Sequence, residues 1–249
     1  MCGIFGIAST KSIKNKLYQG LIKLEYRGYD SSGISGSDDS SKLTTIKATG
    51  PIKNLRTKLK TLTKITTGIA HTRWATHGEP ILKNTHPHLS ENISVVHNGI
   101  IENHIELRSL LKKKNYTFKS DTDSEAISHL IHMYYKKSKN METAIISTSK
   151  MLKGSYAIAC MNTNCPNTIF AACNGSPLII GKGKGENFIA SDITPILADT
   201  RHFMALSDSE FAKITPTKIS VFNSNNKKIN KIVKISKLNS EQSSLSGHK

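Results

Sequence analysis

The sequence predicts an α+β domain made of packed layers of sheet and helix, in which the sheets are mixed or antiparallel. Segments with strand patterning come in groups, and helical patterning falls between the groups. A doubly wound parallel sheet would instead alternate strand and helix, so this order argues against that fold. The 249 residues, 37% of them hydrophobic, suffice for one large core. We expect one domain over residues 1–238 and a polar tail over 239–249.

The first half of the chain predicts short strands and helices in turn. The apolar run GIFGIAS at 3–9 is typical of a buried strand, and apolar residues recur at helical spacing within 11–28. The remaining elements expected in this half are a turn at 37–41, a strand over 42–48, a short helix over 54–62, and two buried strands over 66–73 and 93–99.

The second half predicts three helices followed by a run of strands that one further short helix interrupts. The segment 120–137 is acidic in its first turn and basic in its last, the arrangement that the helix dipole favours. GKGKGE at 181–186 lacks the Lys-Ser/Thr step of a phosphate-binding loop, so it predicts a hairpin turn. The other helices are expected over 103–115, 141–152 and, briefly, 193–199. The strands are expected over 155–162, 167–174, 176–183, 186–191, 203–207, 211–215 and 218–223.

Composition disfavours several functional classes. The chain has a formal net charge of +17, but its basic residues are scattered, nearly all lysine, and not interleaved with aromatics. This pattern is typical of a solvated surface, so we do not expect nucleic-acid binding. No apolar run approaches the roughly 20 residues of a membrane helix, and a secretory signal is not recognisable. Four cysteines without regular spacing favour a cytoplasmic setting.

A cluster of histidines raises the question of a metal site. His71, His77, His86, His88 and His97 fall within 27 positions. None belongs to an HExxH motif and no cysteine lies nearby, so the spacing does not match a zinc site. We expect neither a metal nor a cofactor.

The best candidate for chemistry is Cys2. It follows Met1, and removal of Met1 would leave Cys2 with both a thiol and a free α-amine. A thiol needs a base to become a nucleophile. An α-amine, whose pKa is near 8, can serve as that base for its own side chain. The alternative is an ordinary N-terminal strand that happens to begin with cysteine.

Four further residues would complete such a site. Asn98 and Gly99 could offer a side-chain amide and a backbone N–H to a developing oxyanion. Arg73 could clamp a carboxylate with two parallel hydrogen bonds, and Asp123 could hold an ammonium group. The alternatives are a tight turn for Asn98-Gly99 and a structural ion pair for Arg73 and Asp123. In combination with Cys2, the four residues favour attack on the side chain of an amino acid.

The same stretches carry a family resemblance. The start Cys2-Gly3-Ile4, with Arg27-Gly28, resembles glutamine amidotransferases that have an N-terminal nucleophile, the Ntn-hydrolase type. Within this group, the sequence resembles the glutaminase domain of the glucosamine-6-phosphate synthases, which are glutamine–fructose-6-phosphate aminotransferases (isomerising) of hexosamine biosynthesis. The resemblance covers about residues 2–238 and implies a four-layer αββα fold with two mainly antiparallel sheets. The stretches that carry it are LEYRGYDSSGI, HTRWATHGEP, HPH, VVHNGIIENH, SDTDSE, GSYAIA, GSPLIIG and GENFIASD.

The resemblance also implies a reaction and residue roles. Met1 is removed, Cys2 attacks the side-chain amide of L-glutamine, ammonia leaves, and a glutamyl thioester is hydrolysed to glutamate. Asn98 and Gly99 form the oxyanion hole. The implied substrate-binding residues are Arg73, Thr76 and His77 for the α-carboxylate, and Asp123 and Gly99 for the α-amine. The implied supporting residues are Arg27 and Tyr29 around the nucleophile, Trp74 at the passage of ammonia, and His86 behind the site.

A partner domain is implied as well. Enzymes of this family continue into a sugar isomerase domain that binds fructose 6-phosphate and takes up the ammonia, whereas this chain stops at SSLSGHK. Two alternatives remain open: a catalytically silent module that binds glutamine, and a glutaminase that supplies a different acceptor. The intact set of site residues argues against the first, and the RGYD and HTRWATHG stretches argue against the second.

Overall fold

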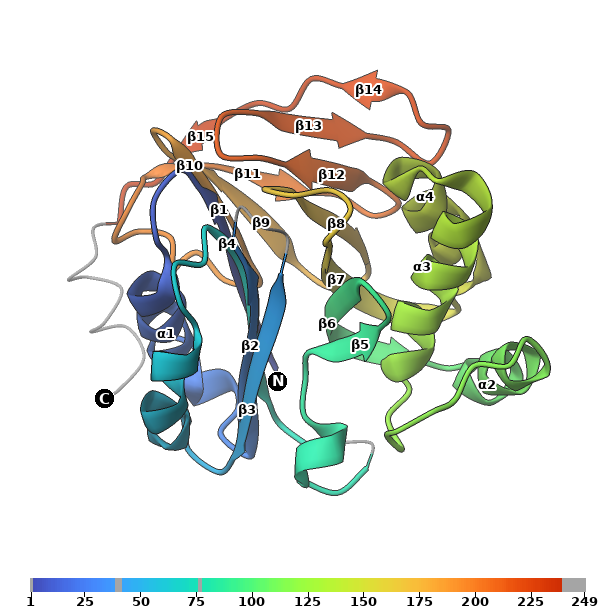
Figure 1. The fold of residues 1–249 in the computed structure, drawn as a ribbon. Coiled ribbons are helices and arrows are strands. Elements are labelled where there is room, and N and C mark those ends of the chain that lie inside the picture. Colours follow the sequence, from blue (N-terminus) through green and yellow to red (C-terminus); the bar gives the residue numbers. More distant parts are fainter. Residues whose placement is uncertain (1, 39–41, 76–77, 239–249) are drawn as a thin grey trace.

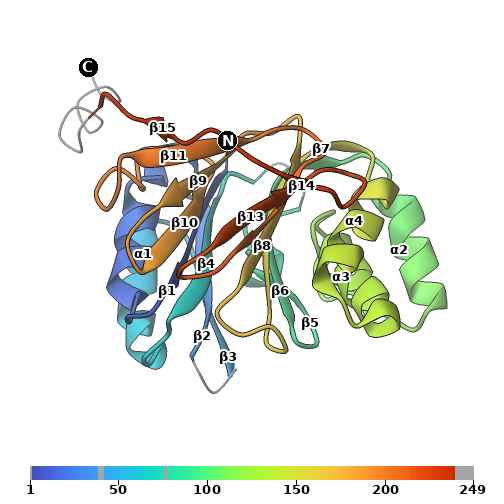
Figure 2. The same cartoon turned by 90° about the horizontal axis from the view of Figure 1, so that it is seen from above.

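Two β-sheets stack face to face and carry helices on both outer faces (Figure 1). The computed structural model describes residues 2–38, 42–75 and 78–238. Seen from above, the two sheets lie between the helix α1 on one side and the helices α2, α3 and α4 on the other (Figure 2). The helices are α1 (Lys14–Ile22), α2 (His104–Lys113), α3 (Glu125–Ser138) and α4 (Met141–Met151). Three 3-10 helices, Glu25–Arg27, Ile52–Thr61 and Leu82–Asn84, accompany them.

The first sheet is centred on the N-terminal strand. Its strands are β1 (Gly3–Ser9), β2 (Ser31–Ser37), β3 (Leu43–Thr49), β4 (Thr67–Arg73), β9 (Leu178–Lys182), β10 (Glu186–Ala190), β11 (His202–Leu206) and β15 (Lys234–Ile235). Their order across the sheet is β15-β11-β9-β10-β1-β4-β2-β3. β1 pairs antiparallel with β4, so that Gly3 lies opposite Thr72. Cys2 therefore lies next to the end of β4.

The second sheet places β6 against the first sheet. Its strands are β5 (His88–Ser90), β6 (Ile93–Ile101), β7 (Gly154–Asn162), β8 (Ile169–Asn174), β12 (Phe211–Ile214), β13 (Ile219–Phe222) and β14 (Lys228–Ile229). Their order is β14-β13-β12-β8-β7-β6-β5. The paired strands in both sheets run antiparallel.

Three apolar clusters hold the four layers together. Phe5 and Ile7 of β1 pack toward α1, whereas Ile4 of the same strand packs between the sheets with Val96 of β6. β1 is apolar on both faces because both of its faces are covered. The third cluster joins α3 and α4 to the outer face of the second sheet. The predicted four-layer αββα architecture is confirmed.

Most of the predicted strands and helices are present, and the differences from the structure are local. The segment 193–199 forms turns and not a helix, and the helix expected over 120–137 begins only at Glu125. The Glu125 carboxylate accepts hydrogen bonds from the backbone N–H groups of Lys119 and Ser120, which holds the preceding segment in a loop. The predicted short helix at 54–62 is a 3-10 helix, Ile52–Thr61. β2 was not predicted. The predicted turn at 37–41 falls largely outside the described residues.

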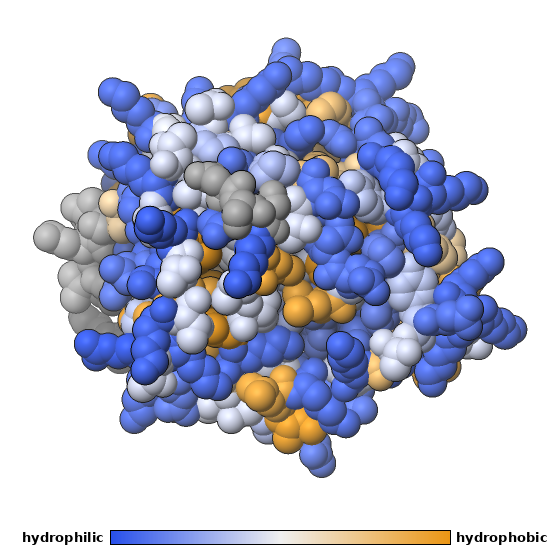
Figure 3. Space-filling model, viewed as in Figure 1, coloured by the Kyte–Doolittle hydropathy of each residue, from blue (hydrophilic) through white to orange (hydrophobic). Residues whose placement is uncertain are grey.

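The surface agrees with the scattered charge of the sequence. Hydrophilic side chains cover most of the face shown in Figure 3, and apolar areas interrupt them in small groups. Among the described residues, the helices are too short or too polar to cross a membrane.

Candidate active site

The sequence-predicted residues meet at one end of the layer between the sheets. Cys2 directly precedes β1, and Arg73 ends the neighbouring strand β4. Asn98 and Gly99 lie in β6 of the opposite sheet, and Asp123 lies just before α3. Each sheet therefore supplies part of the site.

A small cavity marks the place where these residues converge. Its volume is about 20 Å³, close to the space that one water molecule needs. The residues that line it are Cys2, Arg73, Trp74, His86, His97, Gly99, Thr122, Asp123 and Ser124.

The Cys2 thiol is held against the backbone of Trp74. The Trp74 N–H donates to Sγ at 3.3 Å, and Sγ lies 3.6 Å from the Trp74 carbonyl oxygen. Burial raises the pKa of the Cys2 thiol above its usual range. The thiol is therefore protonated near neutral pH, and nucleophilic attack requires a base that removes its proton.

Asn98 contacts Cys2, and Gly99 lines the same cavity. Asn98 Nδ2 donates to the Cys2 carbonyl oxygen at 3.0 Å. Gly99 has a φ of 125°, and a Cβ at this position would lie 2.0 Å from the Ser155 carbonyl oxygen. Only glycine fits this backbone.

Arg73 and Asp123 lie on the cavity wall with charged groups of opposite sign. Arg73 is 4% exposed, and its guanidinium donates to the carbonyl oxygens of Gly78 and Glu79 at 2.8 and 3.1 Å. Asp123 is 5% exposed, and its carboxylate accepts from the Ile101 N–H at 2.7 Å and from the Ser124 hydroxyl at 3.2 Å. Among the ion pairs between described residues, none joins Arg73 to Asp123, which was the structural alternative for them.

Only some of the predicted supporting residues are among the described residues that line the cavity. Trp74 is partly exposed, and its ring packs edge-on to Tyr29 at a centroid distance of 5.5 Å. Arg27 is not among the described residues that line the cavity, and its guanidinium pairs with Asp192 at 2.5 Å. His86 is among the residues that line the cavity. Thr76 and His77 lie outside the described residues.

Sequence reasoning missed several residues that build the site. Thr122, Ser124 and His97 line the cavity, and His97 Nδ1 lies 2.8 Å from the Ser124 hydroxyl. His71 contacts Asn98 from the opposite sheet. The two-residue period of β4 could have indicated His71, because it places His71 on the same face as Arg73.

Four histidines that the sequence groups together are also close in space. The rings of His71 and His88 lie 4.1 and 4.5 Å from that of His86, and His97 lies 6.5 Å from it. Burial lowers the pKa of each of them, so the rings are neutral near pH 7. Within the described residues, no three His, Cys, Asp or Glu side chains are arranged to hold a metal ion.

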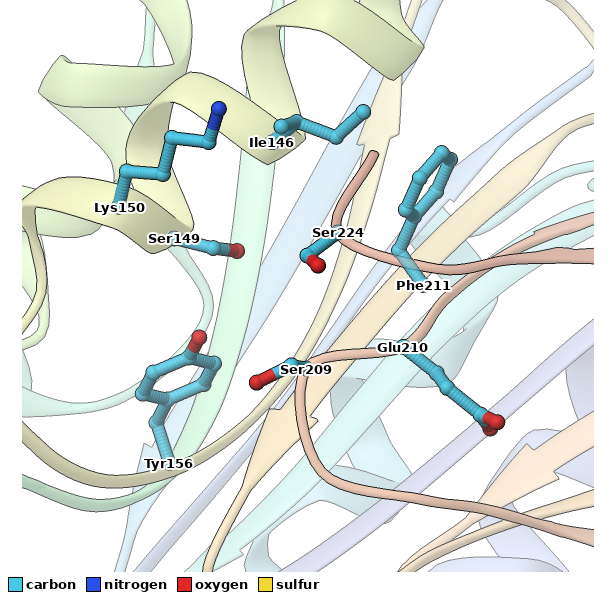
Figure 4. Close-up of a pocket in the computed structure, with 8 residues that line it drawn as sticks. All are labelled: Ile146, Ser149, Lys150, Tyr156, Ser209, Glu210, Phe211 and Ser224. Atoms are coloured by element: carbon cyan, nitrogen blue, oxygen red, sulfur yellow. The ribbon is translucent and has the colours of Figure 1, made fainter. Parts of the chain in front are cut away.

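A second cavity lies on another part of the molecule. It measures about 170 Å³, and the hydroxyl groups of Ser149, Tyr156, Ser209 and Ser224 point toward it, with Phe211 as an apolar wall (Figure 4). Its lining shares no residue with that of the Cys2 cavity and offers no thiol. The Cys2 cavity is therefore the candidate active site.

Comparison with known proteins assigns the chain and its fold to one class. Residues 71–198, just over half of the chain, match the family model described as a glutamine amidotransferase domain, and the chain belongs to this family. The structure of glutamine phosphoribosylpyrophosphate amidotransferase from B. subtilis is similar over 90% of this chain and 49% of that chain, with a TM-score of 0.77 and 27% identity.

Two relatives with higher sequence identity share one name. Glutamine–fructose-6-phosphate aminotransferase (isomerizing) from Wigglesworthia glossinidia brevipalpis is 49% identical over 93% of this chain. The enzyme of the same name from Buchnera aphidicola is 46% identical over 91%. This chain spans 38% and 37% of the lengths of these two relatives. The predicted family is thereby confirmed.

Proposed function

We propose that this chain hydrolyses L-glutamine to glutamate and ammonia, with Cys2 as the nucleophile. The observation that carries the proposal is the convergence of Cys2, Arg73, Gly99 and Asp123 on one cavity. These are the group types that attack on an amino-acid side chain requires: a nucleophile, an oxyanion donor, and opposite charges for the two ends of the amino acid.

Arg73 and Asp123, the charged residues that line the cavity, are proposed to bind the substrate. The Arg73 guanidinium binds the α-carboxylate through parallel N–H donors, in place of the carbonyl oxygens of Gly78 and Glu79 that it now contacts. The Asp123 carboxylate binds the α-ammonium group.

The proposed reaction begins once Met1 has been removed. The α-amine of Cys2 takes the thiol proton, and Sγ forms a bond to the amide carbon of glutamine. Asn98 Nδ2 and the Gly99 N–H stabilise the negative oxygen that results. The carbon–nitrogen bond then breaks, and the nitrogen leaves as ammonia with the proton that the α-amine had taken.

A water molecule completes the cycle. It adds to the thioester carbon and gives a proton to the α-amine. The carbon–sulfur bond breaks, glutamate is released, and Cys2 regains its proton. Each step uses a group of this chain or water.

The wider role is proposed from the named relatives. Ammonia from glutamine serves the synthesis of glucosamine 6-phosphate from fructose 6-phosphate, together with a sugar isomerase domain. The glutaminase domain is proposed to span residues 1–238, with 239–249 outside it. A cytoplasmic location is proposed because a reducing compartment keeps the Cys2 thiol available.

The test is to measure the release of glutamate from glutamine in the absence of fructose 6-phosphate. The protein used is one in which mass spectrometry confirms that Met1 has been removed. Cys2→Ala should abolish release, whereas Cys165→Ala, which removes another partly exposed thiol, should not. Turnover that survives Cys2→Ala contradicts the proposal. Tight glutamine binding without any turnover would favour the silent binding module.

A further inference from the structure

Four buried histidines lie close together, two of them line the Cys2 cavity, and the proposed reaction assigns no chemical step to any of the four. His71, His86, His88 and His97 are each at most 4% exposed. His71 is the member that reaches the proposed oxyanion donor. Its Nε2 lies 3.0 Å from Asn98 Oδ1 and 2.9 Å from the His97 carbonyl oxygen.

The partners of Asn98 fix the orientation of its carboxamide. The Cys2 carbonyl oxygen, 3.0 Å away, can only accept a hydrogen bond, so the end of the carboxamide that faces it is Nδ2. The other end, Oδ1, then faces His71. Because Oδ1 and the His97 carbonyl oxygen both accept, His71 Nε2 carries the proton and donates to them.

The rest of the ring is consistent with this assignment. His71 Nδ1 is buried without a hydrogen-bond partner among the described residues, which suits a nitrogen that carries no proton. Burial lowers the pKa of His71 to about 3, so the ring remains neutral at neutral pH. The arrangement therefore persists throughout the pH range in which the α-amine and the thiol exchange a proton.

We propose that His71 is a positioning residue for glutamine hydrolysis: its Nε2–H holds the Asn98 carboxamide with Nδ2 toward Cys2. The inference rests on the function proposed above. A carboxamide has two orientations of similar shape about its last side-chain bond. The reversed orientation would place an oxygen where the oxyanion needs a donor.

The first test is steady-state kinetics of glutamate release with His71 variants of the processed chain. Loss of one oxyanion donor costs about 10²–10³-fold in kcat, and misorientation of that donor is expected to cost about 10–100-fold. His71→Leu should therefore lower kcat by this factor and change the KM for glutamine less than about twofold. His71→Gln, which keeps a donor at the end of the side chain, should recover most of the rate.

A matched control separates positioning from burial. His129 is 5% exposed and contacts Ser90 and Glu125, away from Asn98. His129→Leu should leave kcat unchanged. If His71→Leu does not fold, His71→Phe keeps a ring and lacks the donor, and it should show the same loss of kcat.

A double-mutant cycle tests whether His71 acts through Asn98. In an Asn98→Ala background, His71→Leu should have no further effect on kcat, because the carboxamide that it positions is absent. An equal loss in both backgrounds, or a rise in KM with kcat unchanged, would overturn the proposal.

A direct measurement is independent of turnover. ¹⁵N NMR of the histidine rings should show the His71 proton on Nε2 in the wild-type chain, and a proton on Nδ1 would overturn the proposal. This result stands even if the chain releases no glutamate. Failure of the proposed function would instead appear as turnover that persists in Cys2→Ala.

Discussion

At the residue scale, the site depends on backbone geometry as much as on side chains. Gly99 combines a positive φ with a close approach to Ser155. Its N–H is therefore aimed by a conformation that a residue with a Cβ cannot adopt without a shift of the strand.

Gly99→Ala should lower kcat for glutamate release by at least about 10²-fold, the usual cost of losing an oxyanion donor. Gly185→Ala is the matched control, because Gly185 also has a positive φ, of 72°, but a Cβ there would meet only Thr10 Oγ1 at 3.4 Å. Wild-type turnover in Gly99→Ala would exclude this backbone group from the oxyanion hole.

Arg73→Lys tests the proposed carboxylate site. A lysine cannot form two parallel hydrogen bonds to a carboxylate, and a lost charge-assisted bond costs about 1.5–3 kcal/mol. We expect the KM for glutamine to rise about 10–100-fold. Arg201→Lys changes an arginine that binds the Ser236 carbonyl oxygen, and it should leave KM unaltered. Equal effects of both substitutions would argue against the assignment.

Retention of Met1 should abolish turnover, because the proposed base would then be part of a peptide bond. Chain that keeps Met1, as verified by mass, is assayed before and after treatment with a methionine aminopeptidase. Glutamate release should appear only as Met1 is lost. Release by chain that still carries Met1 would assign the role of base to another group.

Chemical type alone could indicate Cys2, Arg73, Asn98, Gly99 and Asp123 as candidates, because each supplies a group that the proposed reaction needs. It could not predict the contact that His71 makes. A histidine in a run of histidines first indicates a metal site, and its link to Asn98 depends on how two sheets stack.

At the scale of elements, β2 is a strand that hydrophobic periodicity does not predict. Its sequence, SSGISGS, has the composition of a turn, yet every residue is buried between β3 and β4. Small residues are required because a Cβ on Gly33 would lie 2.1 Å from the His86 carbonyl oxygen.

Long apolar strands and the helices α2 and α4 were predictable, since local periodicity determines them. The turns at 193–199 and the start of α3 depend on contacts that are distant or specific.

Gly33→Ala should destabilise the chain by about 3 kcal/mol, the upper end of the range for overpacking, because the obstacle is backbone. Gly36→Ala, in the same strand, meets only the Ile65 side chain and should cost less. Urea unfolding measures both. Equal free energies of unfolding for the two variants would contradict the close approach of His86 to β2.

At the scale of the whole molecule, the buried histidines make stability depend on pH. His71 titrates near pH 6.5 when unfolded and at about 3 when folded. Between these values the unfolded chain binds the proton, so stability is complete above about pH 6.5 and is lost as the pH falls. From pH 7.5 to 5.5, His71 alone should lower the free energy of unfolding by about 1.4 kcal/mol.

The control is His71→Leu, in which this pH-dependent loss should shrink by about 1.4 kcal/mol, the contribution of one histidine. Urea unfolding of both proteins at the two pH values gives the comparison. An identical loss in the variant would mean that His71 is protonated in the folded chain.

The division of the site between two sheets has a consequence for partial unfolding. Cys2 and Arg73 lie on one sheet or next to it, and Asn98 and Gly99 on the other, while a cluster of apolar side chains packs between the sheets. A loosened state could keep the hydrogen bonds of both sheets, and hence its circular dichroism, while the sheets slide past each other. Turnover would be lost in such a state. Glutamate release therefore reports whether the two sheets are correctly stacked, which circular dichroism does not.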